Sequence, residues 1–346
     1  MLHAGLDLSR TRLDFDLRDA DGVLVEAGAT TPDAAGLARL VQRVARYRQP
    51  VHAAIESMTG ARFVHDQLEL LGWTVAIADA LKVKGLAPLA CKTDRIDARV
   101  LGELSRRALV PAIWLPDPTV RAERERARFR LHLVKQRSRL KHRIHAALLA
   151  HGVPCPVSDL FGVRGRAVLV TRDVPAPWRA HIETAVALVD ELTRHIDALE
   201  RELRRLGTDH RYVALLVTIP GVAWVLGYTI AAEIGDIGRF PSPHQLTGYT
   251  GLCPRVYQSG ERDRRGRLSK LGPRYLRWAL LEAAIHACRH PVYRGRYLQM
   301  KRRLGKQRGA KVAQIDIARR LAAAIWHMLT REQPFAPAGA RTPLVA

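Results

Sequence analysis

The chain has 346 residues and carries 56 Lys and Arg against 33 Asp and Glu, so its formal charge is 56 − 33 = +23 at neutral pH. A hydrophobic content of 47% is enough for folded cores and excludes disorder throughout, and this length favours two or three domains. The charge predicts a polyanionic partner, either nucleic acid or an anionic membrane surface. Aromatic residues make up only 6% of the chain, which argues against stacking of single strands as the main binding mode.

Cysteine spacing and hydropathy indicate the compartment. The four cysteines form no CxxC pair, so the sequence suggests neither a zinc site nor a disulfide framework. The start of the chain does not resemble a signal peptide, and the sequence has no unbroken apolar run of about 18 residues. We therefore expect a soluble, cytoplasmic protein without a membrane partner, which leaves nucleic acid as the favoured polyanion.

The positive charge is unevenly distributed. Residues 1–110 carry 15 basic and 14 acidic side chains, a net of +1, and the remaining residues carry +22. Residues 121–145 hold ten Lys and Arg against two Glu, and residues 262–308 hold fifteen against one Asp and one Glu. We expect the amino-terminal part to carry the chemistry and the rest to grip phosphates, because each neutralised phosphate releases counterions.

The amino-terminal elements have the order of a ribonuclease-H-like α/β domain. Alternating apolar residues over 3–27 predict a three-stranded meander with a hairpin turn at 19–22. A helix is expected from 31 to 47, and apolar strands at Val51–Ile55 and Thr74–Ala78 flank a second helix. A meander followed by helix, strand, helix and strand is typical of this fold class.

Two long helical arms are predicted next, at 119–150 and 178–206. Their apolar positions recur at helical spacing, close to a heptad in the second arm, which predicts a helical hairpin or an intermolecular coiled coil. A plain helical-bundle core is the alternative.

The third region is predicted to be mainly helical. Residues 215–222 resemble the turn of a helix-hairpin-helix element or, alternatively, an ordinary turn between core helices. Residues 251–270 are predicted as a loop, with helices at 272–289 and 307–330. We therefore divide the chain into four parts: a catalytic domain (1–112), helical arms (113–207), a helical domain (208–332) and a flexible tail (333–346).

Four acids stand out by their context. Asp7 lies within the first predicted strand, where a charge is costly without a partner, and Glu56 follows the strand Val51–Ile55. Asp94 and Asp97 lie three residues apart and project from one face of a helix that starts at Thr93. Packing that face against the sheet would bring four carboxylates together, and such a set favours Mg²⁺ or Mn²⁺, with two ions suited to phosphodiester chemistry. Alternatively, Asp94 serves the helix dipole, Asp97 pairs with an arginine and Glu56 is a surface acid.

Blocks along most of the chain resemble the DEDD-type transposases of bacterial insertion sequences of the IS one-ten family, which includes the Piv pilin-gene invertases. The amino-terminal blocks are Gly5-Leu-Asp-Leu-Ser9, Ala54-Ile-Glu-Ser57 and Lys92-Thr-Asp-Arg-Ile-Asp-Ala98. The carboxyl-terminal blocks are Ile219-Pro-Gly-Val222, Arg239-Phe240, Tyr249-Thr-Gly-Leu-Cys-Pro-Arg255, Gln258-Ser-Gly260 and Leu268-Ser-Lys-Leu-Gly-Pro-Arg-Tyr-Leu-Arg277.

The resemblance implies a RuvC-like catalytic domain in which Asp7, Glu56, Asp94 and Asp97 bind divalent metal. It implies that Ser259 is the nucleophile, forming a phosphoserine link to DNA. It also implies a homodimer or tetramer with composite sites, donor and target double-stranded DNA, and a structured bridge RNA that guides the protein.

The residues themselves are compatible with the assignment of Ser259. A serine hydroxyl needs activation, and since no histidine is close in sequence, metal activation across domains is the natural mechanism. A polar loop serine in a solvated basic run is the alternative. The predicted nucleic-acid contacts are Arg255, Arg262, Arg264, Arg265, Arg267, Lys270, Arg274, Arg277, Arg128, Lys135 and Arg139.

The leading hypothesis is therefore a metal-dependent DNA transposase or recombinase. Its rivals are a RuvC-like, structure-specific endonuclease that uses water, a programmed DNA invertase, and a non-enzymatic nucleic-acid-binding protein.

Overall fold

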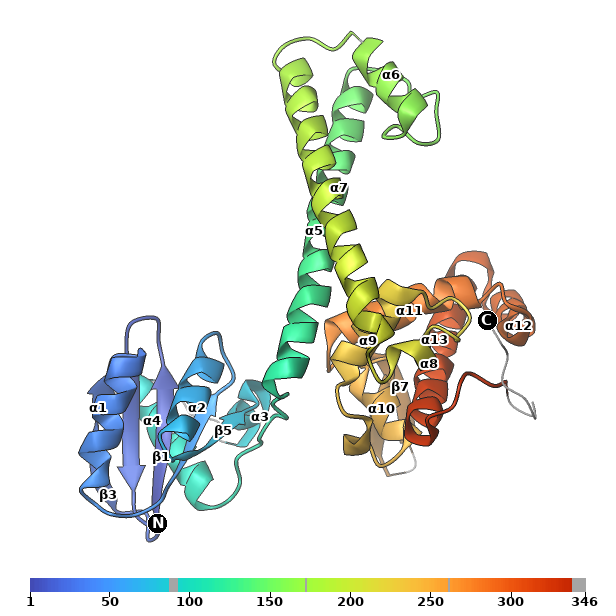
Figure 1. Ribbon diagram of the computed structural model, residues 1–346. Coiled ribbons are helices and arrows are strands. Elements are labelled where there is room, and N and C mark those ends of the chain that lie inside the picture. The colour runs from blue at the N-terminus through green and yellow to red at the C-terminus, as the bar shows by residue number, and fades with distance from the viewer. Residues whose placement is uncertain (87–92, 172, 261, 338–346) are drawn as a thin grey trace. The chain divides into compact units, whose positions relative to one another are not determined.

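A computed structural model describes residues 1–86, 93–171, 173–260 and 262–337, without the side chains of Arg95, Ser259, Asp263, Arg265, Lys306 and Gln307. The chain divides into two compact units, and the boundary lies between Leu115 and Pro116. The first is the α/β unit and the second is helical apart from one β-hairpin (Figure 1).

A five-stranded mixed sheet forms the centre of the α/β unit. Its strands are β1 (Leu2–Leu8), β2 (Leu13–Arg18), β3 (Leu24–Thr30), β4 (Val51–Glu56) and β5 (Thr74–Ala78), in the order β3-β2-β1-β4-β5. The first three are antiparallel, and β4 and β5 run parallel to β1. The predicted meander and both later strands are confirmed, including the tight turn in which the Gly22 N–H donates to the Asp19 carbonyl.

Helices cover both faces of this sheet. α1 (Ala34–Ala45) and α2 (Ala61–Leu70) bury their apolar stripes against one face, where Leu37, Val64 and Leu68 lie in the core formed with β1 and β2. α4 (Asp94–Arg106) covers the other face, where its Leu101 packs on small residues of β4 and β5. A short helix after β5, α3 (Ala80–Leu86), was not predicted.

The two predicted arms are present as α5 (Pro118–Ala150) and α7 (Trp178–Thr208), which run side by side in Figure 1. Apolar residues at the predicted helical spacing are buried in both arms: Leu131, Ile144 and Leu148 in α5, and Val189 and Ile196 in α7. A short helix, α6 (Val163–Thr171), packs at the far end of the hairpin, where Leu160 and Val174 join the arms in a separate small core.

The arms are rooted in the helical core. Ala127 of α5 and Leu203 of α7 are buried in the same cluster as the carboxyl-terminal helices, so the structure places no boundary between compact units near residue 207. The remaining helices are α8 (Val213–Leu216), α9 (Trp224–Ile234), η1 (Ile237–Arg239), α10 (Pro243–Tyr249), α11 (Arg274–Ala287), α12 (Pro291–Leu304) and α13 (Lys306–Arg331).

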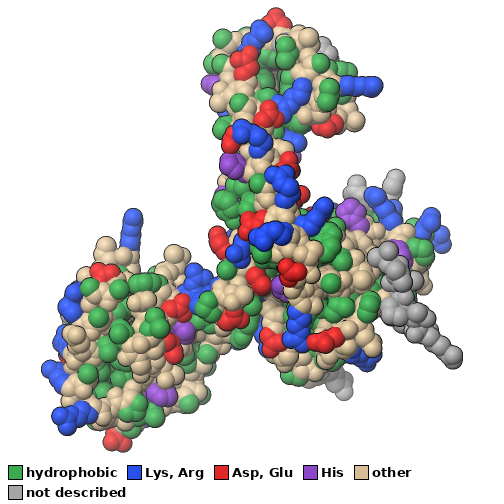
Figure 2. All heavy atoms as spheres, in the orientation of Figure 1, with side chains coloured by type: hydrophobic (Ala, Val, Ile, Leu, Met, Phe, Trp, Pro, Cys, Tyr) green, Lys and Arg blue, Asp and Glu red, His purple; other side chains and the backbone are tan. Residues whose placement is uncertain are grey.

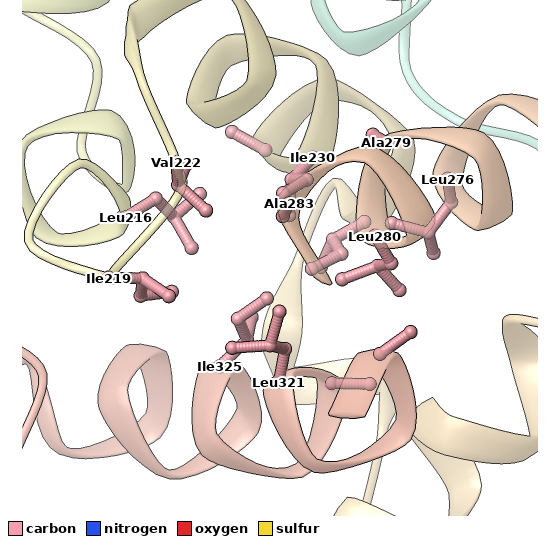
Figure 3. Packing of buried hydrophobic residues seen from close by; sticks show 14 of the residues in the cluster. Leu216, Ile219, Val222, Ile230, Leu276, Ala279, Leu280, Ala283, Leu321 and Ile325 are labelled. Carbon is pink, nitrogen blue, oxygen red and sulfur yellow. The ribbon is translucent and has the colours of Figure 1, made fainter. Parts of the chain in front are cut away.

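Figure 3 shows how this core is built. Leu216, Ile219 and Val222 from the α8–α9 region face Leu280 and Ala283 of α11 and the apolar side of α13. The predicted tail also contributes: Phe335 is buried, and its N–H donates to the Thr218 hydroxyl at 2.9 Å. The expectation of a flexible segment from residue 333 is therefore wrong at Phe335, because an aromatic side chain there completes the core, and residues 338–346 lie outside the described part.

The Pro-Gly turn at 219–222 is a turn between core helices. Ile219 and Val222 are buried, and a Cβ on Gly221 would lie 2.6 Å from the Ala283 carbonyl oxygen of α11. Because α11 approaches the turn so closely, the structure favours the ordinary-turn interpretation over a phosphate-binding hairpin.

The loop predicted at 251–270 is instead a two-stranded hairpin of β6 (Pro254–Ser259) and β7 (Arg262–Leu268). The prediction failed because this segment lacks an alternation of apolar and polar residues. Such an alternation appears when one face of a sheet is buried, and most described side chains of this hairpin are exposed.

Within the described residues, no helix combines the length and apolar character that crossing a membrane requires.

Candidate active site

Asp7 and Glu56 lie at the same edge of the sheet. In the parallel pair β1–β4, Leu6 is opposite Ile55, so the next residues along both strands, Asp7 and Glu56, are at one level. Leu6 and Ile55 face the core under α1 and α2, so by alternation Asp7 and Glu56 face α4. Both acids are half-buried. This is the carboxyl end of the parallel strands, where open α/β sheets collect functional groups.

Gly5 brings α4 onto the same face. A Cβ at Gly5 would lie 1.7 Å from the Ala98 carbonyl oxygen and 2.3 Å from the Gly102 nitrogen, so only glycine allows this contact between strand and helix. Thr93 caps α4, since its hydroxyl accepts the Ile96 N–H at 3.3 Å. The cap and the close approach position the first turn of the helix near Asp7.

The first turn of α4 carries the other two predicted acids. Asp94 is exposed and Asp97 is half-buried. The pKa of Asp7 is raised to about 6, firstly by burial and then by the negative charges of Asp94, Asp97 and Glu56, with Asp14 contributing least. All four predicted acids therefore share one electrostatic neighbourhood.

The acids are not arranged as a closed coordination shell. Within the described residues, no group of three or more His, Cys, Asp or Glu side chains is placed so that it could hold a metal ion. The segment just before the α4 cap, residues 87–92, lies outside the described residues. The structure thus brings Glu56, Asp94 and Asp97 close enough to Asp7 for their charges to raise its pKa, but does not show the four acids as metal ligands.

Two further acids on this sheet, Asp14 and Asp16, are each paired with an arginine. Asp14 pairs with Asp7 across β1–β2 and is only 3% exposed, and it accepts from Arg12 Nε at 2.7 Å and Nη2 at 2.8 Å. Asp16 is buried and accepts from Arg18 Nε at 2.6 Å. No described basic side chain forms such a pair with Asp7. A half-buried carboxylate without a cation is costly, which distinguishes Asp7 from Asp14 and Asp16.

Asp14 is not among the acids that the sequence led us to expect at this site. The signal was present in the alternating segment Leu13-Asp-Phe-Asp-Leu17, which places positions 14 and 16 on one face of β2. Pairing of that strand with β1 was needed to show that Asp14 lies opposite Asp7.

Ser259 is the last residue of β6, and its backbone pairs with Arg262 of β7. The side chains of Ser259 and Arg265 lie outside the described part of the structure. Ser259 belongs to the second unit and the four acids to the first.

The predicted nucleic-acid contacts separate into two groups. Arg128 and Arg277 are used inside the fold: Arg128 forms a two-point ion pair with the fully buried Glu233, and Arg277 Nη1 donates to the carbonyls of Thr250 and Lys270, both at 3.2 Å. Burial lowers the pKa of Arg277. The exposed group consists of Arg255, Arg262, Arg264, Arg267, Lys270, Arg274, Lys135 and Arg139.

Comparison with known proteins gives two family matches. Residues 4–152 match a family of DEDD transposases of IS110 elements, and residues 213–299 match the family described as Transposase IS116/IS110/IS902 family.

Three relatives illustrate the similarity. The transposase for insertion sequence element IS1328 of Yersinia enterocolitica is 28% identical over 293 residues, covering 83% of this chain and 86% of that protein. A probable family 20 transposase of Pseudomonas aeruginosa is 28% identical over 300 residues, covering 84% of this chain and 88% of that protein. The pilin gene-inverting protein of Moraxella bovis is 30% identical over 130 residues, covering 37% of this chain and 39% of that protein.

The two matches follow one another along the chain. The first includes all four acids on the sheet and α4, and the second includes Ser259 and the exposed arginines of β6 and β7. The protein is therefore an enzyme of the IS110/IS116/IS902 transposase family, with a DEDD-type transposase domain at its amino-terminal end.

Proposed function

We propose that this transposase cleaves and rejoins double-stranded DNA with a RuvC-like, metal-binding first unit and with Ser259 as the nucleophile. The observation that carries the proposal is the environment of Asp7. This half-buried carboxylate has no arginine partner among the described residues, and its pKa is raised to about 6 firstly by burial and then by the negative charges of Asp94, Asp97 and Glu56. The arrangement is unfavourable without a cation and becomes favourable with one.

The donor set fits a hard divalent ion. Asp7, Glu56, Asp94 and Asp97 would hold Mg²⁺ or Mn²⁺, since carboxylate oxygens without histidine or cysteine favour these ions over zinc. When bound, two such ions supply activation of an attacking oxygen and stabilisation of a leaving oxygen in phosphodiester exchange.

Ser259 is proposed to form the bond to DNA. Its hydroxyl oxygen attacks the scissile phosphorus, its proton passes to solvent, and the departing 3′ or 5′ oxygen takes up a proton. The exposed Arg255, Arg262 and Arg264 on the same hairpin are suited to hold the phosphate and balance its growing charge. Because Ser259 and the acids belong to different units, we further propose a homodimer or tetramer with composite sites.

We also propose that a structured bridge RNA supplies sequence recognition by base pairing with donor and target DNA. The +22 carried by the residues beyond 110 supports binding of more polyanion than one DNA site. In a cell the protein would then act where DNA and newly made RNA are both present, in the bacterial cytosol and nucleoid.

A suicide DNA substrate tests the nucleophile. The substrate loses its leaving strand after cleavage, so a covalent protein–DNA adduct accumulates and is seen on a denaturing gel. We expect an adduct that requires Mg²⁺ in wild type, is absent in Ser259→Ala and is absent in Asp97→Asn. Ser269→Ala is the matched control, because Ser269 lies at the base of the same hairpin, and it should retain the adduct.

Metal-dependent cutting that persists in Ser259→Ala without an adduct would replace this proposal by a water-using endonuclease. Cleavage that is unchanged in both Asp7→Asn and Asp97→Asn would remove the four-acid site.

DNA inversion is the alternative biological outcome. The similarity to the pilin gene-inverting protein favours it, although that match spans only 130 residues. Inversion and transposition use the same strand chemistry and differ in how the DNA sites are arranged. A plasmid with two element ends in inverted orientation distinguishes them, because inversion flips the intervening segment and transposition releases it.

A further inference from the structure

The hairpin of β6 and β7 is mostly exposed to solvent. In the described structure it is a sheet of only two strands, and Val256 and Tyr257 are 56% and 58% exposed. A two-stranded ribbon is marginally stable alone in water. Val256 and Tyr257 are consecutive, so each face of the ribbon exposes one large side chain to solvent.

The base of this ribbon is firmly built. The Ser269 N–H donates to the Cys253 carbonyl at 2.8 Å, and the Lys270 N–H donates to the Gly251 carbonyl at 3.1 Å. Arg277 joins both sides by donating to the Thr250 and Lys270 carbonyls. The ribbon is therefore held at its base while its strands remain exposed to solvent.

The strand register collects positive charge on one face. Tyr257 is opposite Arg264 and Ser259 is opposite Arg262, and alternate residues of a strand share a face. Tyr257, Arg262 and Arg264 therefore lie on the same side of the ribbon. Across residues 254–268 there are five arginines and two acids, so the net charge is 5 − 2 = +3.

The dimensions of a ribbon select among nucleic acids. The major groove of B-form DNA is about 12 Å wide and admits a two-stranded ribbon. The major groove of A-form RNA is deep and too narrow to be read by side chains. Single strands are usually bound through several stacked aromatic residues, whereas Tyr257 is the sole aromatic residue in the sequence 254–268.

We propose that the strands β6 and β7 enter the major groove of duplex DNA. Arg262 and Arg264 contact phosphates or guanine edges, and Tyr257 contacts the sugar and base edges in the groove. This inference rests on the proposed function, because the proposed nucleophile belongs to strand β6 of the same hairpin.

The test compares matched DNA and RNA duplexes of about 30 base pairs, bound to the full-length protein in EDTA so that no chemistry occurs. The double variant Arg262→Gln/Arg264→Gln should bind the DNA duplex about 10-fold more weakly and the RNA duplex less than about 2-fold more weakly. Arg62→Gln, on an exposed position of α2, is the matched charge control and should bind both duplexes as wild type does.

A second pair of variants separates groove contact from net charge. Tyr257→Phe should bind the DNA duplex as wild type does, and Tyr257→Ala should bind it several-fold more weakly. A thermal melt of each variant checks that the fold is retained, so a loss of affinity at unchanged melting temperature is informative.

The groove is tested with a DNA duplex whose pyrimidines carry bulky groups at C5, which fill the major groove. Wild type should bind this duplex about as weakly as the double variant binds ordinary DNA, and a minor-groove ligand should not compete. Equal losses on DNA and RNA, or competition only by the minor-groove ligand, would overturn the inference. These measurements involve no cleavage, so a missing adduct in wild type would defeat the proposed nucleophile and leave the groove contact standing.

Discussion

Asp7 differs from its neighbours Asp14 and Asp16 in its partners rather than in its residue type. Asp14 and Asp16 are buried and each accepts two hydrogen bonds from one arginine. Asp7 is held among other acids, and its pKa rises to about 6. A carboxylate paired with arginine stabilises the fold, whereas a carboxylate among carboxylates destabilises it until a cation binds.

Asp7→Asn is therefore expected to stabilise the metal-free protein. Since the folded-state pKa lies above the ordinary 3.8, the penalty for ionising Asp7 develops as pH rises past 3.8 and is complete above about 6. At neutral pH the substitution should raise the free energy of unfolding by about 1 kcal/mol, less than the full shift implies, because the partly exposed group is screened by water.

Urea denaturation in EDTA at pH near 4 and pH near 7.5 measures this effect, and the two proteins should be equally stable at the lower pH. Mg²⁺ should stabilise wild type and have little effect on Asp7→Asn. A variant that is less stable than wild type in EDTA at neutral pH would contradict the raised pKa.

At the scale of elements, close backbone contact places the acidic site. α4 lies on β1 because Gly5 has no side chain at the point where the Ala98 carbonyl and the Gly102 nitrogen approach. The arms are instead anchored by side chains of α5 that bind the end of α9. Arg124 donates to the carbonyls of Ala232 and Glu233. Arg128 donates to the carboxylate of Glu233.

Gly5→Ala is expected to separate α4 from the sheet. The new Cβ would overlap the Ala98 carbonyl oxygen, and because this is backbone the helix must move, at a cost of about 3 kcal/mol or more. Thermal unfolding and the adduct assay should both show the loss. Gly85→Ala in α3 is the matched control, since a Cβ there meets nothing within 4 Å, and it should not destabilise the protein. Equal melting temperatures for wild type and Gly5→Ala would refute the contact.

The buried carboxylate of Glu233 is expected to be essential to the root of the arm. Its side chain is 0% exposed and pairs with Arg128, so Glu233→Ala leaves a guanidinium without its partner and should cost about 3 kcal/mol. The double variant Arg128→Met/Glu233→Leu removes both charges and should recover much of that stability, as measured by denaturant unfolding. A double variant less stable than Glu233→Ala would show that the pair itself, rather than the unpaired charge, matters.

For the whole molecule, the arms are less basic than α5 alone indicates. Arg126 and Arg130 of α5 form ion pairs with Glu202 and Glu200 of α7. Figure 2 shows Lys and Arg interspersed with Asp and Glu along the arms. Residues 178–208 carry five basic and six acidic side chains, a net of 5 − 6 = −1. Part of the positive charge of 121–145 is thus balanced within the fold.

The salt dependence of nucleic-acid binding distinguishes cations that are exposed on the arms from cations that form ion pairs between the arms. Lys135→Gln/Arg139→Gln removes two exposed cations and should reduce the slope of log affinity against log salt by about 2 if both contact phosphates. Arg126→Gln/Arg130→Gln removes the same formal charge from the ion pairs with α7 and should change the slope much less. Equal changes for the two double variants would show that the ion pairs between the arms do not persist when nucleic acid binds.

Local pattern predicted most of the fold. Periodic apolar residues mark the three-stranded meander, the Thr93-capped helix and both arms, and short apolar runs mark β4 and β5. These apolar residues are the ones that the cores bury. The hairpin of β6 and β7 lacks such a signal since most of its described side chains are exposed. α12 buries only Tyr293 among its described core positions, which explains why its sequence gave no clear helical stripe.

The spacing of the acids, the excess of positive charge beyond residue 110 and the resemblance of the blocks to a transposase family can all be read without any structure. Which charges remain available depends on how the elements pack. Packing places Asp7 among acids and Asp14 beside Arg12, and it turns Arg128 inward onto Glu233 while leaving Lys135 exposed. The physical reason is that the energy of a charge depends on its burial and on partners distant in sequence, and both are set only when the elements pack.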